Sequence, residues 1–517
     1  MINSLFRKIL ALYIILLFIG TSVLPGMSKE IKSLEQTSGL IPSSDVLDVN
    51  YIYNITKALS DIVFTEYDDN EIARGRDFGS VGEHKAANIL LENMSNLGLW
   101  TWKESIVNTP ILPDVASVYW VNEYNIVLKN ISSGVSKKID GYISPAWKGP
   151  RGSPNIVDYN FSFQDLKFKL APRNLQPFGR FLRDGFCKDD YVYIMEDTSY
   201  NPNITYPIRE ILTRFLGPYS DFSIFYGYAK LMASLAIWYK FYPHCQGLVR
   251  YDFNDDTYNM VNAENWNLPV VFINGTIGKE ILSNIDNYRL DFYINQNYKE
   301  SVESYNVIGQ LNGTDPSKTV LVDCLYDGWW TQATGDSAIG MAMVLGIAKW
   351  FKDNNITPKY TVKFVGFGGE ERGLRGAKYY SDIHKDENII YVIDLNQLGF
   401  FQGYPELNLD IMSNNAGFLK DIFKIAEQSD YANRTGYAGL RKFYMPRGAP
   451  SDDRAFTGRI GCKTVCFLKG INWALHHRDG LGHTEGDVLK YFDTTDVTVT
   501  GEIILNITKY LIVNQLN

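Results

Sequence analysis

Several features that mark particular classes of protein are scarce or missing in this sequence. Lysine and arginine form no cluster, and the 50 basic residues are outnumbered by 58 acidic residues, for a net charge of −8. Binding to the phosphates of nucleic acid needs a basic surface, so no nucleic-acid partner is expected. Repeats and low-complexity linkers are also missing. The remaining composition, 45% hydrophobic and 21% charged in 517 residues, is typical of a globular protein with two or three domains.

Cysteine is scarce, and its spacing limits the disulfides that can form. The five cysteines leave one unpaired if every disulfide is internal. Cys187 and Cys245 could form a bridge in the middle of the chain. Cys462 and Cys466 fall in one predicted strand, where residues four apart are separated by about 13 Å, which is too far for a disulfide. Buried free thiols are the alternative for all of them.

Long hydrophobic runs are missing except near the N-terminus. Residues 9–19 form an apolar run that follows the basic Arg7 and Lys8. This layout is typical of a secretory signal, and the run is shorter than the about 20 residues that cross a membrane. Residues 1–26 are therefore expected to be a signal peptide or, alternatively, an N-terminal membrane anchor. Either reading predicts a secreted or cell-surface protein, and recurrent N-x-[ST] sequons fit a glycoprotein.

The middle of the chain differs in composition from the parts on either side. Residues 27–115 are expected to form the N-terminal part of the main domain, with a helix over residues 83–97. Residues 116–300 are rich in tyrosine, asparagine and proline, and their short apolar runs predict an inserted β-rich domain. The strands predicted there are residues 191–195, 247–251 and 269–273.

Residues 301–517 alternate between apolar strands and amphipathic helices. This pattern predicts an α/β fold with a mostly parallel (mixed) central sheet flanked by helices. The predicted strands are residues 319–324, 361–367, 389–395 and 464–468. The predicted helices are residues 337–352, 376–383, 416–428 and 501–517.

Polar residues follow these strands, at the positions where α/β enzymes place their catalytic groups. Because the carboxyl ends of parallel strands meet at one edge of the sheet, these side chains are expected to converge on one site. The residues concerned are Asp327, Asp336, Glu370, Glu371, Asn396 and His483.

The adjacent pair Glu370 and Glu371 is the most informative part of this set. Neighbouring side chains that leave a strand point in different directions, so one carboxylate can bind a metal while the other holds a water. Simpler alternatives exist for each residue. The two glutamates could favour the first turn of a helix, Asp336 could be an N-cap, and His483 could be an ordinary loop histidine.

Several stretches of the sequence resemble the motifs of one family of zinc exopeptidases. The family includes bacterial leucyl aminopeptidase, glutamate carboxypeptidase, glutaminyl cyclase and the non-enzymatic transferrin receptor. The resemblance covers most of the chain after the signal, and the middle segment is similar to a protease-associated domain. The stretches are RDFGSVGEHKAANILLENMSNLGL, YNVIGQLNGTDPSKTVLVDCLYDGWW, GFGGEERGLRGAKYY, PSDDRAF and GHTEGDVLKYFD, with VYIM, QGLVRYD and NLPVVFINGTIGKEIL in the middle segment.

The resemblance implies a role for each residue of one complete metal site. Asp336 matches the carboxylate that bridges two metals in the family, and Glu371 and His483 match two further ligands of one of them. Glu370 matches the general base. Three protein ligands and an open position are the usual arrangement of a catalytic zinc.

The ligands of the family's second metal are replaced. Its histidine is matched by Leu325 and its aspartate by Asn396, and neither residue is a good zinc ligand. Asp327, which would orient that histidine, is retained. One zinc ion is therefore expected. A second zinc ion is still possible if Asp394 or one of the loop histidines, His476 and His477, supplies a ligand in place of Leu325 or Asn396.

The implied activity is the hydrolysis of terminal peptide bonds, with aminopeptidase activity favoured. Zinc lowers the pKa of a bound water to about 7, and Glu370 would take its proton and pass it to the leaving amine. Carboxypeptidase activity stays open because Arg441, Arg447 and Arg454 could bind a terminal carboxylate. Asp452 lines the site or, with Asp453, caps a turn.

Two other functions are compatible with the same motifs. One is a catalytically inactive scaffold, which the loss of the second metal site favours. The other is a one-zinc glutaminyl-cyclase-like aminoacyltransferase. Peptides or proteins are the expected substrates, the N-terminal anchor is the only expected membrane contact, and the resemblance implies a homodimer as one oligomeric state.

Overall fold

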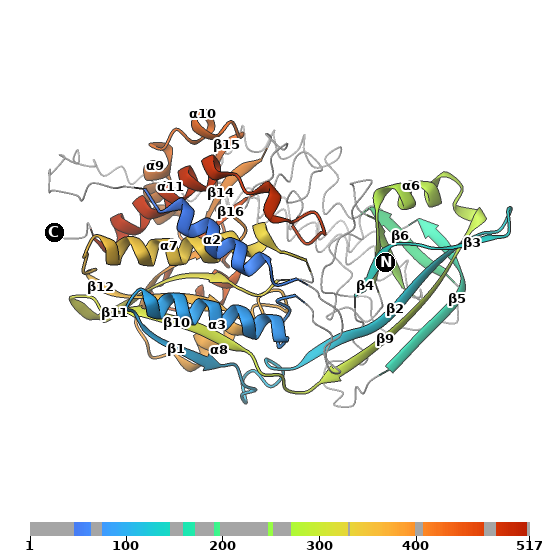
Figure 1. The fold of residues 1–517 in the computed structure, drawn as a ribbon, viewed down its shortest axis with the longest axis horizontal. Coiled ribbons are helices and arrows are strands. Elements are labelled where there is room, and N and C mark those ends of the chain that lie inside the picture. Colours follow the sequence, from blue (N-terminus) through green and yellow to red (C-terminus); the bar gives the residue numbers. More distant parts are fainter. Residues whose placement is uncertain are drawn as a thin grey trace, which may run out of the picture. The chain divides into compact units, whose positions relative to one another are not determined.

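The computed structural model contains two sheets with their helices, both within residues 44–517 (Figure 1). The predicted signal or anchor, Cys187, Cys245, His476 and His477 lie outside the residues it describes. None of the helices in the described part is long and apolar enough to cross a membrane. The described residues are 46–63, 75–144, 159–170, 191–196, 247–251, 270–328, 331–398, 407–469 and 482–513.

The first sheet has eight strands in the order β1-β10-β12-β11-β13-β16-β14-β15. Its four inner strands β12, β11, β13 and β16 are mutually parallel, while β1, β10 and β14 make antiparallel pairs. The predicted mixed α/β sheet is therefore confirmed. The strands are β1 (Trp100–Ser105), β10 (Tyr305–Leu311), β11 (Asp315–Leu325), β12 (Tyr360–Phe367), β13 (Ile389–Leu395), β14 (Asn408–Ser413), β15 (Gly439–Tyr444) and β16 (Lys463–Lys469).

Several of the helices begin where a polar side chain caps the first turn. The side chain of Ser80 accepts a hydrogen bond from the Glu83 amide at the start of α3, and Asn415 and Asp493 cap α9 and α11 in the same way. The α-helices are α2 (Val49–Ser60), α3 (Val81–Asn96), α6 (Gly275–Ser283), α7 (Ile339–Asp353), α8 (Arg375–Ile383), α9 (Ala416–Glu427), α10 (Tyr431–Thr435) and α11 (Thr494–Ile512).

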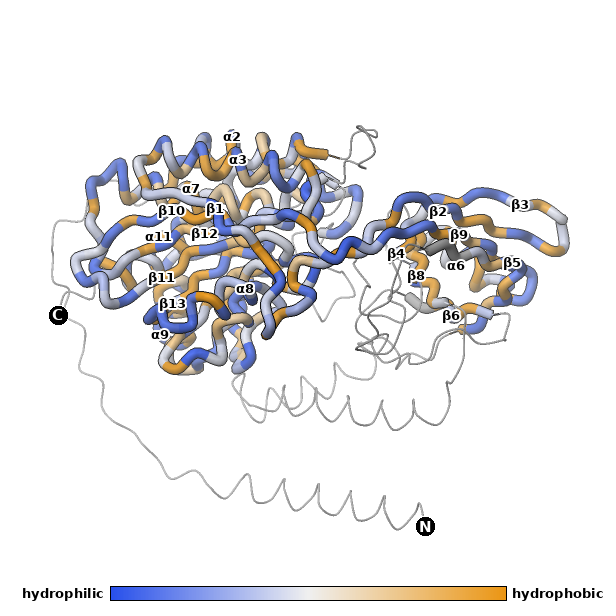
Figure 2. The backbone as a smooth tube through the Cα atoms, turned by 90° about the horizontal axis from the view of Figure 1, so that it is seen from below, coloured by the Kyte–Doolittle hydropathy of each residue, from blue (hydrophilic) through white to orange (hydrophobic). Residues whose placement is uncertain are grey.

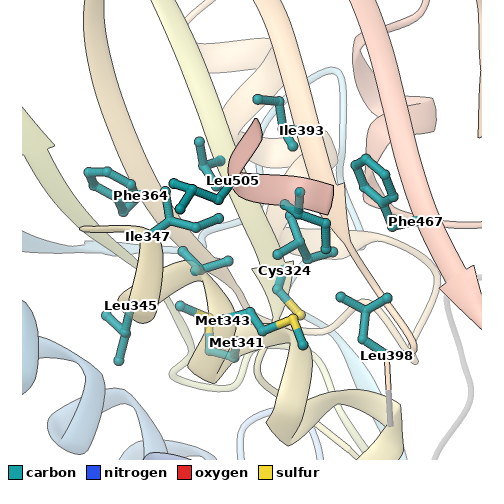
Figure 3. Packing of buried hydrophobic residues seen from close by; sticks show 14 of the residues in the cluster. Cys324, Met341, Met343, Leu345, Ile347, Phe364, Ile393, Leu398, Phe467 and Leu505 are labelled. Atoms are coloured by element: carbon teal, nitrogen blue, oxygen red, sulfur yellow. The ribbon is translucent and has the colours of Figure 1, made fainter. Parts of the chain in front are cut away.

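The main hydrophobic core lies between the first sheet and α7. Nearly every residue of α7 is buried, and Figure 3 shows Met341, Met343 and Ile347 of this helix beside Cys324 of β11 and Phe364 of β12. A helix that is apolar on all sides must be covered on all sides, and α2 and α11 belong to the same core. Rigid packing here fixes the carboxyl ends of the strands, where the predicted site residues follow.

A second eight-stranded sheet forms within residues 116–300, the segment predicted to be an inserted domain. Its long strands β2 and β9 pair antiparallel, and residues of β9 alternate between buried and partly exposed positions. Figure 2 shows the hydrophobic residues along the strands of both sheets. The protease-associated identity of the segment stays a prediction. The strands are β2 (Val118–Asn130), β3 (Val135–Lys138), β4 (Gly141–Ser144), β5 (Tyr159–Leu170), β6 (Tyr191–Glu196), β7 (Leu248–Tyr251), β8 (Val270–Ile273) and β9 (Tyr288–Lys299).

Candidate metal centre and active site

Three of the predicted ligands converge at the carboxyl ends of the parallel strands. The Nε2 atom of His483 lies 2.8 Å from Asp336 Oδ2 and 3.1 Å from Glu371 Oε1. One ligand atom from each of the three residues lies within 4.8 Å of the others. They come from segments as far apart in sequence as residues 336 and 483, so the fold rather than local sequence assembles the group.

Asp336 is positioned by its backbone. It belongs to an irregular turn, η3 (Thr334–Ala338), that precedes α7. The Asp487 carboxylate accepts hydrogen bonds from the amides of Gly335 (2.7 Å) and Asp336 (3.0 Å). No side chain caps α7, so the structure does not support the alternative that Asp336 is an N-cap. Its carboxylate is directed to His483 instead.

Asp327 positions the loop that carries Glu370 and Glu371. Its two carboxylate oxygens accept hydrogen bonds from the amides of Glu370 (3.0 Å) and Glu371 (3.2 Å). The resemblance implied that Asp327 would orient a histidine, but Leu325 stands at that histidine's position. In the structure Asp327 binds the amides of Glu370 and Glu371 instead. Helix α8 begins only at Arg375 and has no acidic residue in its first turn. The helix-terminus alternative for the two glutamates is therefore not supported.

Buried charges that the sequence motifs did not reveal hold these loops in place. Arg372, directly after the two glutamates, forms an ion pair with Asp77, with Nη2–Oδ2 and Nε–Oδ1 distances of 2.7 and 2.9 Å. Arg76 is fully buried and donates hydrogen bonds to the backbone oxygens of Tyr326 and Ala333, next to the loops of the site. The RDFGSVGEH stretch contains both Arg76 and Asp77.

Gly369 has a steric reason to be glycine. Its φ angle of +71° lies in the left-handed region, and a Cβ atom would come within 2.4 Å of the Phe78 ring. The turn into the two glutamates therefore depends on the missing side chain.

The electrostatics of the group are those of a site for a cation. Burial, the Glu371 charge and the Asp452 charge together raise the pKa of Glu370 well above its ordinary value. Burial would lower the pKa of His483, but the Glu371 and Asp336 carboxylates outweigh it and raise that pKa well above the usual range. Acidic side chains thus outnumber the one histidine that could balance them, and a bound cation would relieve their repulsion.

The residues that replace the family's second-metal ligands lie outside this group. Leu325 is fully buried in the main hydrophobic core. The Asn396 amide donates a 2.7 Å hydrogen bond to Ser451 Oγ. Asp394 lies in a different cluster, with Asp453 and Cys466. Asp394 therefore does not join Asp336, Glu371 and His483, and the other candidates, His476 and His477, lie outside the described residues.

A carboxylate pair and an imidazole are ligands that zinc binds in proteins, so Asp336, Glu371 and His483 fit this ion. The side chain of His483 is 28% exposed, whereas those of Asp336 and Glu371 are 8% and 6% exposed. A ligand or water could therefore reach the group from the side of the histidine.

Residues 306–508 match peptidase family M28. Carboxypeptidase Q from Xenopus laevis is 30% identical over 161 residues, which are 29% of this chain and 34% of that protein. Alkaline phosphatase isozyme conversion protein from Escherichia coli is 27% identical over 186 residues, 34% of this chain and 51% of that protein. The matched regions thus span between a third and about half of the length of these relatives.

Solved structures with the same fold include zinc aminopeptidases. The chain is similar to the zinc aminopeptidase BSAP from Bacillus subtilis, with a TM-score of 0.55 and 15% identity over 90% of this chain and 95% of that one. A peptidase M28 precursor from Shewanella amazonensis gives a TM-score of 0.59 at 15% identity, over 89% and 92% of the chains. At such identities the similarity shows the fold alone. The family match, however, falls on the segment that carries Asp336, Glu370, Glu371 and His483, so it is residues 306–508 of this chain that are similar to peptidase family M28.

Proposed function

We propose that this protein is a zinc-dependent exopeptidase that removes residues from the amino terminus of peptides. The observation that carries this proposal is the convergence of Asp336, Glu371 and His483 at the carboxyl ends of the sheet, with Glu370 beside them. One zinc ion is expected at this group, because Leu325 and Asn396 replace two ligands of the family's second metal.

The chain's own residues supply the remaining steps of hydrolysis. Asp336, Glu371 and His483 would hold the zinc ion, which would supply a Lewis acid for the scissile carbonyl and lower the pKa of a bound water. Glu370 takes the proton of the attacking water and then gives it to the leaving amine, so that the base is regenerated in each turnover. A raised pKa suits this double role, because a carboxyl group with a higher pKa holds the proton more readily. Asp327 keeps Glu370 in place through its amide.

The charge of the site favours an amino terminus over a carboxyl terminus. Glu370 and Asp452 are acidic neighbours beside the metal ligands, and when ionised they would attract the ammonium group of a peptide and repel a terminal carboxylate. Arg441, one of the arginines that kept carboxypeptidase activity open, is bound by the Asp410 carboxylate at 2.6 and 2.7 Å. Its guanidinium is thus already paired.

We further propose that the protein acts outside the cell, as a secreted or N-terminally anchored glycoprotein. This rests on the apolar run of residues 9–19 and on the sequons of the sequence. Cleavage at the signal would be seen as a mature N-terminus near residue 26.

The test is a peptide assay combined with metal analysis of the purified protein. A peptide with a free amino terminus is compared with its N-acetylated form and with its C-terminal amide. We expect loss of the first residue from the free and amidated peptides only, inhibition by a chelator, and recovery with zinc. His483→Ala should lose the zinc and the activity. His84→Ala is the matched control, because His84 lies on α3 and contacts Glu303 rather than the metal group.

Other outcomes would assign a different function. Release of the last residue, blocked by amidation, would identify a carboxypeptidase. A peptide with N-terminal glutamine that loses ammonia without hydrolysis would identify a cyclase. Stoichiometric zinc lost in His483→Ala, but no reaction with any peptide, would overturn the peptidase proposal and leave a metal-binding scaffold.

A further inference from the structure

A second group of metal-binding side chains lies inside the sheet, separate from the candidate active site. Three neighbouring parallel strands bring it together. Asp323 of β11 pairs with Asp394 of β13, and Asp394 pairs with Cys466 of β16. Paired residues of adjacent strands point to the same face of a sheet, so these side chains form a row.

A short helical turn closes over this row. The turn η4 (Asp452–Phe456) contacts β13 and β16. The amide of Asp453 donates a 3.2 Å hydrogen bond to Asp394 Oδ2, and Thr464 Oγ1 donates a 2.7 Å hydrogen bond to Asp453 Oδ2. One ligand atom each of Asp394, Asp453 and Cys466 lies within 4.8 Å of the others.

The carboxylates in this group lack the partners that buried charges require. Asp323, Asp394, Asp452 and Asp453 are all 0% exposed. Both carboxylate oxygens of Asp323 and of Asp452, and one each of Asp394 and Asp453, accept no hydrogen bond among the described residues. No lysine or arginine in the described part of the chain forms an ion pair with any of the four. Unpaired buried carboxylates are costly, so neighbouring ones persist only when a cation or protons neutralise them.

The position of these carboxylates within the fold distinguishes them from an ordinary cluster of acidic residues on the protein surface. A chance cluster of carboxylates would face water, where each would be hydrated. Here the row lies between the sheet and η4, and Cys466 adds a fully buried thiol to it.

We propose that Asp394, Asp453 and Cys466 bind a structural zinc ion, with Asp323 next to Asp394 in the same row. The ligand types favour zinc, because thiolate, carboxylate and tetrahedral coordination suit it, while calcium and magnesium take oxygen donors only. The site shares no residue with the candidate active site. It also differs from the vacant position marked by Leu325 and Asn396, because Asp394 lies two residues before Asn396, about 6.6 Å further back along the strand.

This ion would fasten η4 to the centre of the sheet. Binding would replace the proton of the Cys466 thiol, so one proton leaves for each thiolate–zinc bond that forms. Because every donor is buried, the ion is expected to enter during folding and to exchange slowly afterwards. Asp452 belongs to the same turn, and its charge raises the pKa of Glu370. By fixing η4, the buried ion would therefore also fix the position of Asp452 relative to Glu370.

The first test counts metal ions in the full chain, produced in medium that contains zinc. We expect two zinc ions per chain in the wild type. His483→Ala should keep one, the buried ion, and Cys466→Ser should keep one, the ion of the active site. Cys462→Ala is the matched control, because Cys462 is also a buried free cysteine but lies outside the cluster, and it should keep both.

The second test replaces zinc with cobalt, because the absorption spectrum of bound cobalt shows whether a thiolate is among its ligands. Protein produced in cobalt medium should show a thiolate-to-cobalt charge-transfer band in the wild type and in His483→Ala and Cys462→Ala, but not in Cys466→Ser. The wild-type spectrum decides the question even if Cys466→Ser fails to fold. A wild type with no thiolate band, or whose zinc is lost completely in His483→Ala, overturns the proposal. Failure of the exopeptidase proposal would appear separately, as absence of hydrolysis with the active-site ion in place.

Discussion

Two acidic groups lie on the same sheet, and they differ in what surrounds them. In the candidate active site, Asp336, Glu371 and His483 stand on loops after the strands, and the histidine is 28% exposed. In the buried group, Asp323, Asp394 and their neighbours lie within the strands and η4, and all are 0% exposed. Metal-binding side chains thus lie both at the solvent-accessible edge of the sheet and in its buried interior.

This difference in exposure matches the different needs of a catalytic metal ion and a structural metal ion. A catalytic metal must keep one position open for water or substrate, which requires an accessible edge and ligands held from behind. Asp327 and Asp487 do this by binding the amides next to Glu371 and Asp336. A structural ion needs the opposite arrangement, in which all donors come from the protein and none reaches solvent. The strand register provides that arrangement in the buried row.

The largest effect should come from removing the base while keeping both metal groups. Glu370→Gln retains the shape of the side chain but cannot accept the proton of water. We expect a loss of about 10²- to 10⁴-fold in kcat, as for other general bases, with unchanged zinc content. Kinetics and metal analysis of the same preparation measure both. A fall in zinc content would show that Glu370 is a ligand, and full activity would show that another group is the base.

A large loss of stability should follow when a partner is removed from a buried ion pair beneath the active site. Arg372→Met leaves the Asp77 carboxylate buried without its guanidinium, which costs about 3–5 kcal/mol in comparable pairs. Lys57→Met is the control, because Lys57 and Asp61 form a solvent-exposed pair, whose loss should change stability little. Denaturant unfolding compares the two. Equal effects would mean that the buried pair does not support the loop.

The inner strands of the first sheet could be predicted because burial on both faces makes them continuously apolar. The prediction of residues 361–367 agrees with β12 (Tyr360–Phe367), and residues 389–395 agree with β13. Edge strands carry no such signal. Most residues of the edge strand β15 are only partly buried, and β15 was not predicted. Its neighbour β14 was also missed, although all but one of its residues are buried. Cys462 was expected inside a strand, but β16 begins one residue later, and Cys462 and Cys466 are both free thiols.

The candidate site could be predicted as far as its motifs extend. Local spacing reveals that Glu370 and Glu371 follow a strand, and a resemblance adds Asp336 and His483. Neither the spacing nor the resemblance reveals that Asp487 holds the turn before α7. That contact joins residues about 150 positions apart in the sequence and depends on the fold. The row of Asp323, Asp394 and Cys466 was missed for the same reason. It arises from the register of three strands, and no spacing within one strand indicates it.

The smallest effect concerns Glu387, a partly buried carboxylate that has a charged partner, unlike the unpaired carboxylates in the row. Burial would raise the pKa of Glu387, but hydrogen bonds and the charge of Lys363, with a hydrogen bond from Thr319, outweigh it and lower that pKa. The folded state therefore binds the proton less tightly than the unfolded state does. Its stabilising contribution is present above the ordinary glutamate pKa of about 4.3 and is lost as pH falls through the lowered value.

Glu387→Gln should therefore reduce stability by about 1 kcal/mol at neutral pH, since it removes a charged acceptor from the 2.8 Å contact with Lys363. The difference between wild type and variant should shrink as pH falls from about 4.3 through the lowered pKa of Glu387, where the folded wild type takes up the proton. Glu427→Gln, at an exposed position at the end of α9, should match the wild type throughout. Unfolding curves measured across this pH range test the sign. A difference that grows on acidification would mean that Glu387 destabilises the fold when ionised, as an unpaired buried carboxylate does.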